Sequence, residues 1–344
     1  MQKIKKEIIQ KSKKQFNKQL KQKEKKEIPE LSFNSYFSKL KIKLIGIGGA
    51  GCSIVSRLKL NSVKGLEIWG INTDAQVLNK LSLPKKFLIG EKTLEGLGTG
   101  MDWKLGQKAA EESKENLKEI IKDSDIVFLI AGLGGGTGTP IISFLSKLAK
   151  DLKILTIAII TLPFSFEGGV RKKLANWGLK KLQKNIDAYL VIPNDRILKI
   201  INKNTTLEDS FLRVNKVLNE ALEGIFEILL SQDGIITLDM ADLEEILRNS
   251  GQIVFNQGKG KGEQRALTAL NQALQSLLID FSSKKIKNVL FNISGQDISL
   301  AEVSLITNQL KKITNKNIKI LFGVLENKNL EKGELKINLI ASLK

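Results

Sequence analysis

Short apolar runs alternate with amphipathic stretches through the first half of the chain. Each run is nearly continuous in Ile, Leu, Val and Ala, and most end in glycine or small polar residues. The runs are Ile42–Ile47, Leu66–Ile71, Phe87–Ile89, Ile126–Ile130, Leu155–Leu162 and Ala188–Ile192. Apolar strands separated by helices are typical of a Rossmann-like parallel sheet covered on both faces. The pattern predicts an α/β fold whose ligands bind at the carboxyl ends of the strands.

A long helix follows this first αβ region. Thr205 and Glu208 form a capping-box start, and one apolar stripe then runs to about Ser231. At about 1.5 Å per residue the helix is roughly 40 Å long, enough to link two domains. Beyond it we expect a second, smaller α/β domain. Its predicted elements are strands at Val289–Ile293, Ile318–Val324 and Leu335–Ile340 and a helix at Leu300–Leu310.

Residues 1–40 differ from the rest of the chain. They contain 12 Lys and 4 Glu and few apolar residues, so they contribute +8 of the net charge of +19. We expect a disordered basic arm that becomes a weak amphipathic helix when bound. The predicted organisation is an arm at 1–40, a first domain at 41–205, a connecting helix at 206–232 and a C-terminal domain at 233–344.

Composition excludes several classes of enzyme. The 344 residues include no histidine, which rules out Ser-His-Asp and Cys-His hydrolases and His-containing zinc sites. Acid–base chemistry therefore falls to Asp, Glu, Lys or water. The single cysteine, Cys52, excludes an internal disulfide framework and fits a reducing cytoplasm. The basic excess has two interpretations: lysine-rich solvated faces, or attraction to nucleic acid or an anionic membrane.

Three glycine-rich loops are the candidate ligand-binding elements. Gly46–Ser53 follows the first strand and opens a helix, so backbone N–H groups and the helix dipole favour an anion there. Gly46, Gly48 and Gly51 alone fit a dinucleotide fingerprint, but the acidic residue expected to close the second strand is absent. Ile130–Thr139 forms a second loop and Gly96–Gly100 a third. Several loops suit the phosphates of a nucleoside triphosphate better than a dinucleotide, and no P-loop pattern is present.

The loop Gly134–Thr139 resembles the signature loop of the tubulin/FtsZ superfamily. Other segments resemble that family in the same order, namely Asn72–Gln76, Gly90–Lys92, Pro163–Gly168 and Ile192–Asp195. The resemblance runs from about Ile42 to the C-terminus. It implies the tubulin/FtsZ fold, with GTP or GDP and Mg²⁺ bound in the domain at 41–205. It also implies a polymerising GTPase for cell division, located in the cytoplasm at the inner face of the membrane.

The resemblance also implies roles for particular residues. Glu167 and Arg171 hold the ribose and a neighbouring phosphate, Asn194 meets the sugar or base, and Phe211 and Asn215 stack on and pair with guanine. We expect nucleotide contacts at Gly48, Gly49, Ala50, Gly51, Cys52, Gly98, Thr99, Gly100, Gly134, Gly135, Gly136, Thr137, Gly138, Glu167, Arg171, Asn194, Phe211 and Asn215. Asn72 and Asp74 are candidates for positioning magnesium or phosphate, with turn formation as the alternative. No metal ligand is assigned.

The segment Ile236–Leu243 resembles the family's catalytic loop, whose carboxylates enter the nucleotide site of the adjacent subunit. Asp239 and Asp242 are the expected catalytic residues; the alternative for Asp239 is capping of a helix. The long connecting helix separates them from Phe211, so we expect head-to-tail stacking to complete the site. The expected partner is thus a second copy of the chain.

Some positions depart from the family pattern. Thr237 replaces an Asn, Pro140 a Gly, and Cys52-Ser53 a Gly-Asn pair. The sequence stops at Lys344, without the terminal peptide that recruits membrane tethers, so we expect the basic arm to provide membrane or partner attachment.

Two other functions compete with this interpretation. A dinucleotide-dependent oxidoreductase predicts one glycine loop and an acid closing the second strand. A non-hydrolysing filament relative that binds DNA or membrane is favoured by the charge and Thr237 and opposed by Asp239 and Asp242.

Overall fold

The computed structural model describes residues 40–58, 65–198, 206–230, 234–275, 286–314 and 318–343. Contacts group Leu40–Lys344 into one unit. The predicted arm, apart from Leu40, and Thr205 of the predicted capping box lie outside the described residues. The account below concerns the described part of the unit that begins at Leu40.

A parallel sheet forms the first half of this unit, as the apolar runs predicted. Its strands are β1 (Ile42–Ile47), β2 (Leu66–Asn72), β3 (Lys85–Leu88), β4 (Ile126–Gly132), β5 (Leu155–Leu162) and β6 (Ala188–Pro193). They pair in parallel in the order β3-β2-β1-β4-β5-β6. All six predicted runs are confirmed as strands, with ends that shift by up to two residues.

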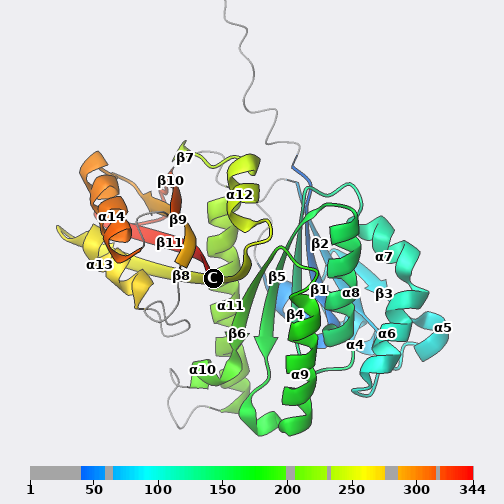
Figure 1. Cartoon of the computed structure of the whole chain (residues 1–344). Helices are drawn as coiled ribbons and strands as arrows, with labels where there is room; N and C mark the ends of the chain where they lie inside the picture. The colour runs from blue at the N-terminus through cyan, green and yellow to red at the C-terminus, as the bar shows by residue number, and fades with distance from the viewer. Residues whose placement is uncertain are drawn as a thin grey trace, which may run out of the picture. The chain divides into compact units, whose positions relative to one another are not determined.

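Helices cover both faces of this sheet, so successive side chains of a central strand enter different cores. Phe128 and Ile130 of β4 pack in one hydrophobic cluster, and Val127 and Leu129 pack in another. The covering elements are α3 (Gly48–Val55), α4 (Ala75–Lys80), α5 (Glu91–Leu94), α6 (Trp103–Glu112), α7 (Lys114–Ile121), α8 (Gly138–Asp151), η1 (Ser165–Glu167), α9 (Gly169–Leu182) and α10 (Asn194–Leu198). Figure 1 shows α8 and α9 in front of the sheet.

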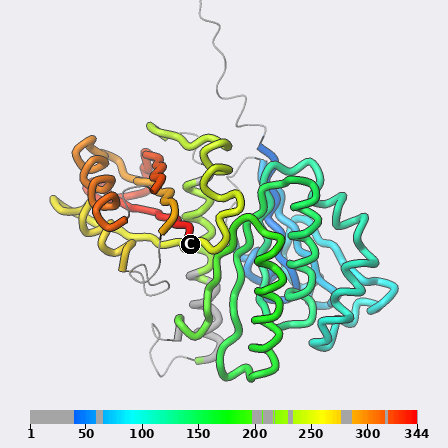
Figure 2. The backbone as a smooth tube through the Cα atoms, viewed as in Figure 1, coloured from blue at the N-terminus to red at the C-terminus, as the bar shows by residue number. Residues whose placement is uncertain are grey.

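The long predicted helix is α11 (Leu207–Leu230), whose 24 residues span about 36 Å. Leu218, Leu222 and Ile225 of its apolar stripe are buried in the cluster that also contains residues of the C-terminal strands. Figure 2 shows the helix running between the two halves of the unit. The helix therefore packs against residues of both halves of the unit.

The C-terminal half extends the same sheet. Its elements are β7 (Gly234–Ile236), α12 (Met240–Leu247), β8 (Gly251–Lys261), α13 (Arg265–Leu274), β9 (Ile286–Gly295), α14 (Leu300–Ile313), β10 (Lys319–Glu326) and β11 (Glu334–Leu343). The order continues β6-β8-β11-β9-β10-β7, with β8 parallel to β6 and antiparallel to β11. The three strands and the helix predicted in this half are confirmed, and the described strands of both halves form one mixed sheet.

Strand β8 was not predicted, because glycines interrupt its apolar pattern. A Cβ at Gly258 would collide with the carbonyl oxygen of Ala269, and one at Gly260 with that of Arg265. Helix α13 therefore packs directly on the backbone of β8, which only glycine permits.

A largely buried network of polar side chains connects α11 to the C-terminal strands. The carboxylate of Glu227 pairs with Lys336 and accepts hydrogen bonds from Ser294 Oγ at 2.7 Å and Asn338 Nδ2 at 2.9 Å. The side chains of Glu227 and Lys336 are only 16% and 14% exposed. Breaking such a pair by removing one partner leaves a poorly solvated charge, which is strongly destabilising.

We expect Glu227→Ala to lower the free energy of unfolding by about 3 kcal/mol, because Lys336 would lose its counter-charge. Urea denaturation measures the change. Glu223→Ala, at an exposed position of the same helix, is the matched control and should change stability little. Equal effects of the two substitutions would show that the network contributes no more than helix propensity.

Candidate functional site

The first glycine loop turns directly into α3. Ile47 precedes the helix without a side-chain cap, so the first N–H groups of α3 have no partner within the helix. Gly48, Gly49 and Ala50 line a cavity at this point. Gly51 and Cys52 were predicted to contact nucleotide but do not line the cavity. They lie further along the helix, where N–H groups are used in the helix itself.

The second glycine loop leads in the same way into α8. Thr137 precedes this helix without capping it, and Gly135, Gly136, Thr137 and Gly138 line the cavity. Gly134 does not line it, and its N–H donates to Thr139 Oγ1 at 2.9 Å. Pro140 lies in the first turn of α8, where the missing N–H breaks no helical hydrogen bond.

The N-termini of α3 and α8 meet at the cavity. A Cβ built on Gly48 would lie 3.1 Å from the backbone nitrogen of Gly138, and Gly48 has a positive φ of 69°. Two helix N-termini with free N–H groups at one place form a strong anion site. This geometry suits phosphate groups.

Three threonine hydroxyls link the loops around these helix ends. Thr137 Oγ1 lies 2.8 Å from Thr73 Oγ1 and 3.4 Å from Thr99 Oγ1. Gly98, Thr99 and Gly100 line the cavity, as predicted for the third loop. Thr73, which is fully buried, was not predicted as a site residue; its position directly after Asn72 at the end of β2 was the available signal.

Charged and amide groups line the other side of the cavity. Arg171 Nη1 donates to Glu167 Oε2 at 2.9 Å, and Glu167 Oε1 accepts the N–H of Phe164 at 2.8 Å. Asn194 is buried, and its Oδ1 has no hydrogen-bond partner among the described residues. A buried acceptor of this kind is satisfied by a hydroxyl or amino donor on a bound ligand.

The cavity has a volume of about 560 Å³ and combines an anion site with ligand-facing polar groups. Asn72 and Asp74 also line it, but both serve the local turn: Asn72 Oδ1 accepts the N–H of Thr73, and Asp74 Oδ1 that of Val77, each at 2.9 Å. Within the described ranges no group of three or more Asp, Glu, His or Cys could hold a metal ion. Mg²⁺ commonly binds through few carboxylates and through substrate phosphates.

Comparison with known proteins identifies the family and the fold. The Tubulin/FtsZ family, GTPase domain, matches residues 41–202, and the FtsZ family, C-terminal domain, matches residues 251–343. The cell division protein FtsZ of Buchnera aphidicola is 37% identical over 303 residues, which cover 88% of this chain and 78% of that protein. The chain belongs to the tubulin/FtsZ family.

Other members of the tubulin/FtsZ family support this assignment. Cell division protein FtsZ 1 of Pyrococcus abyssi is 36% identical over 89% of this chain and 83% of its own length. The structure of an empty FtsZ dimer from M. jannaschii has a TM-score of 0.83 and 36% identity, with 92% of each chain covered. CetZ2 of Haloferax volcanii shares the fold at 21% identity, with a TM-score of 0.74 and coverage of 89% and 94%. The GTPase domain of the tubulin/FtsZ family implies that this chain binds GTP and GDP, and every residue that lines the cavity lies within the matched residues 41–202.

The side chain of Cys52 fills space beneath the first glycine loop of the cavity. Its thiol is buried and donates to the carbonyl oxygens of Gly46 at 3.2 Å and Ile71 at 3.5 Å. Burial raises the pKa of the thiol to about 12, so it stays protonated and unreactive at neutral pH.

The other predicted site residues either lie away from the pocket or have side chains that the structure does not describe. The side chains of Phe211 and Asn215 lie outside the described residues. Asp239 and Asp242 form a capping box at the start of α12: Asp239 Oδ1 accepts the N–H of Asp242 at 2.7 Å. The capping alternative is thus observed, and neither carboxylate lines the pocket of its own chain.

No helix of the described chain is long and apolar enough to cross a membrane.

We expect Gly51→Ala to destabilise the fold and weaken GTP binding together, because the added Cβ would collide with the carbonyl oxygen of Ile130. Such overpacking typically costs about 1–3 kcal/mol. Thermal unfolding and retention of labelled GTP on a filter measure the two effects. Gly169→Ala, in α9, is the control: nothing lies within 4 Å of its Cβ, so stability and binding should be unchanged. Normal GTP binding by Gly51→Ala would contradict the packing argument.

Proposed function

We propose that this chain is a cell-division GTPase that assembles head to tail and hydrolyses GTP at the contact between subunits. The observation that carries the proposal is the separation of two functional elements along α11. The pocket includes Asn194, the first residue of α10, and α10 contacts α11 near its start. Asp239 and Asp242 follow the other end of α11, beyond β7. Figure 1 shows α10 and α12 at opposite ends of α11.

A helix of about 36 Å keeps these two elements apart within one subunit. Stacking the catalytic-loop end of one subunit on the pocket of the next brings them together. Because such a contact joins two different surfaces and does not close, it generates a filament. Names of relatives agree with this: one solved FtsZ structure is described as a dimer, and a CetZ2 structure as a GTPγS-bound protofilament.

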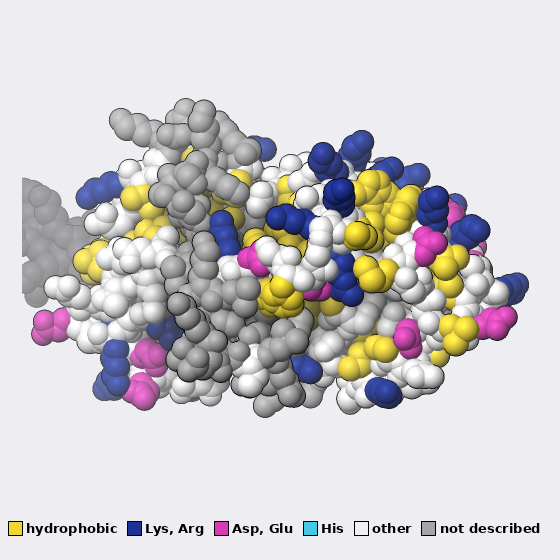
Figure 3. Space-filling model, turned by 90° about the horizontal axis from the view of Figure 1, so that it is seen from below, with side chains coloured by type: hydrophobic (Ala, Val, Ile, Leu, Met, Phe, Trp, Pro, Cys, Tyr) yellow, Lys and Arg dark blue, Asp and Glu magenta, His cyan; other side chains and the backbone are white. Residues whose placement is uncertain are grey.

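Exposed hydrophobic side chains support association at both ends. Around the pocket, Leu97 is 80% exposed, Phe166 60% and Val170 75%; beside the catalytic loop, Ile235 is 70% exposed. Figure 3 shows hydrophobic side chains gathered on the face that carries the pocket. Apolar groups at the two surfaces that would meet are expected of an association interface.

In the proposed reaction, the free N–H groups of α3 and α8 hold the phosphates, and Arg171 stays oriented by its ion pair with Glu167. Asp239 or Asp242 of the next subunit orients water, or takes its proton, beside the γ-phosphate. Bound Mg²⁺ would neutralise charge that develops on the phosphates. The capping box supports this role, because it fixes both carboxylates at one exposed helix start.

This proposal includes the predicted organisation, with domains at 41–205 and 233–344 and a linking helix at 206–232. It also includes location at the division site on the inner face of the membrane. The arm at 1–40 lies outside the described residues, apart from Leu40, and its charge supports attachment to a membrane or tether protein. Binding of DNA by a non-hydrolysing filament is the second candidate, which the net charge of +19 favours. Salt-sensitive DNA retention without phosphate release would select it.

We expect Asp242→Asn to bind GTP normally and to lose hydrolysis by on the order of 10²-fold or more. Asparagine keeps an oxygen that can accept the N–H of Asp239, so the cap is retained while the charge is lost. GTP retention and phosphate release, measured at several protein concentrations, separate binding from turnover. Full turnover by Asp242→Asn would rule out a catalytic role for this carboxylate.

Mixtures of two defective variants test whether the site is shared. Asp242→Asn keeps an unchanged pocket, whereas Arg171→Ala changes the pocket and keeps both carboxylates. If the site is shared, phosphate release by the mixture should exceed the sum of the two variants measured alone, because carboxylates of Arg171→Ala subunits complete the pockets of Asp242→Asn subunits. Activity equal to that sum would place the whole site in one subunit.

We expect Val170→Asp and Ile235→Asp each to reduce GTP-dependent pelleting strongly, because each would bury a charge in the proposed contact. Both side chains are exposed in the single subunit, so its folding should be unaffected. Leu300→Asp is the matched control; Leu300 is 85% exposed on α14 and belongs to neither surface. Reduced pelleting by the control alone, or by all three variants equally, would contradict the proposed surfaces.

A further inference from the structure

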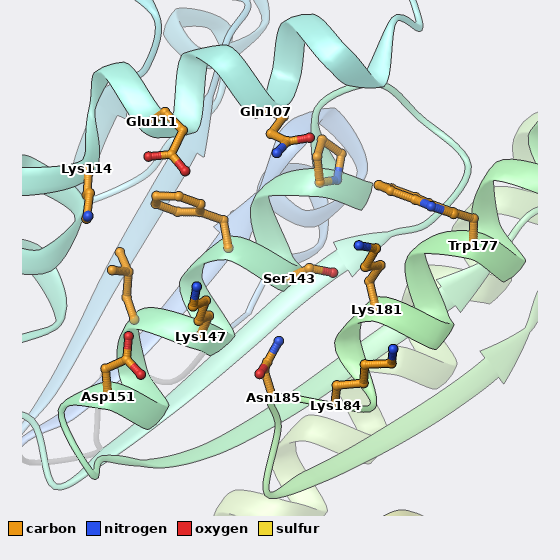
Figure 4. Close-up of a pocket in the computed structure, with 13 residues that line it drawn as sticks. Gln107, Glu111, Lys114, Ser143, Lys147, Asp151, Trp177, Lys181, Lys184 and Asn185 are labelled. Carbon is orange, nitrogen blue, oxygen red and sulfur yellow. The ribbon is translucent and has the colours of Figure 1, made fainter.

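We propose that a groove between α6, α8 and α9 docks an acidic peptide segment that carries an aromatic or aliphatic side chain. The groove has a volume of about 470 Å³ and shares no lining residue with the nucleotide pocket. Figure 4 shows its lining side chains, which come from these three helices, from Lys114 at the start of α7 and from the turn that follows α9. The GTPase reaction proposed above gives this groove no role.

The floor of the groove is apolar and fixed in place. Phe144 and Trp177 are half-buried, and Pro140, in the first turn of α8, lines the groove with them. Trp177 packs against Trp103 of α6, with ring centroids 4.5 Å apart and planes tilted by 47°. Rigid, partly exposed aromatic rings provide contact area at small entropic cost, as anchor sites for a peptide side chain do.

Lysines surround this floor. Lys114, Lys147, Lys181 and Lys184 all line the groove, and within the described part of the chain none forms an ion pair with an acidic side chain. Lys181 Nζ lies 5.8 Å from the centre of the Trp177 ring. The acidic lining residues are Glu111 and Asp151, so four positive charges against two negative ones leave an excess of two. This excess of positive charge favours an acidic ligand.

Polar groups between α8 and α9 add directional contacts. Figure 4 shows Ser143, Lys181, Lys184 and Asn185 around the space between these helices. Ser143 Oγ is buried and has no hydrogen-bond partner among the described residues. A carboxylate there could accept from the hydroxyl and from nearby ammonium groups, which are charge-assisted contacts.

Charge also decides which occupant fits. The chain's own arm at 1–40 carries +8, and a second copy carries +19, so the lysines repel both. Acidic peptides of another protein are attracted. The groove includes neither the pocket residues nor the loop at Asp239, so docking does not compete with head-to-tail stacking.

Two probe peptides test the proposal with full-length protein and GDP. One alternates glutamate with phenylalanine, and the other is polyglutamate. We expect the mixed peptide to change tryptophan fluorescence saturably, and polyglutamate to bind more weakly because it lacks an apolar side chain. Lys181→Glu with Lys184→Glu should lower the affinity for the mixed peptide on the order of tenfold. The control is Lys311→Glu with Lys312→Glu, an equal charge change in the last turn of α14, which should leave the affinity unchanged.

Three results would overturn the proposal. Equal loss of peptide affinity in both charge-reversed proteins would mean that the overall charge of the protein, rather than the groove, attracts the peptide. Equal affinity for both peptides would show that the apolar floor of the groove does not contribute to peptide recognition. Altered self-association of the Lys181→Glu, Lys184→Glu protein without peptide would assign the groove to a second copy. Phosphate release measured on the same samples reports the GTPase separately, so failure of one proposal is distinguishable from failure of the other.

Discussion

The meeting of two helix N-termini is the constraint on which the rest of the molecule depends. Helices α3 and α8 follow neighbouring strands, β1 and β4, and approach so closely that a Cβ on Gly48 would lie 3.1 Å from the backbone nitrogen of Gly138. Gly51 brings α3 onto the carbonyl of Ile130 in the same way. Backbone N–H groups, rather than side chains, thus form the proposed phosphate site, and the sheet fixes their position.

The second constraint is the rigidity and length of α11. Its apolar stripe is buried between the two halves of the sheet, and Glu227 pairs with Lys336 near its far end. The pocket and the capped carboxylates of Asp239 and Asp242 are therefore held apart. A subunit that cannot bring its own carboxylates to its own nucleotide would make turnover depend on assembly, which is the regulatory consequence of the proposed arrangement.

Sequence patterns predicted the first half of the fold well, because parallel strands buried on both faces are nearly continuous in apolar residues. They failed at β8, where glycines at 258 and 260 serve helix packing and hide the strand. Loop spacing predicted residues that line one cavity, but Gly51 and Cys52 from the same prediction do not line it, since a glycine that packs a helix looks the same in sequence as one that faces a cavity. Thr73 was missed because hydroxyl contacts between distant loops leave no periodic signal.

The net charge of this protein differs in sign from the charge of its pocket lining. The chain carries a net charge of +19, yet the charged residues that line the described pocket are Asp74, Glu167 and Arg171, with a sum of −1. Lysines take no part in that lining. In the proposed site, backbone N–H groups, helix dipoles and hydroxyls bind the phosphates, and the proposed Mg²⁺ would balance the remaining charge. The lysines lie on outer surfaces such as the groove between α6, α8 and α9, where they can set the choice of partner without altering the nucleotide site.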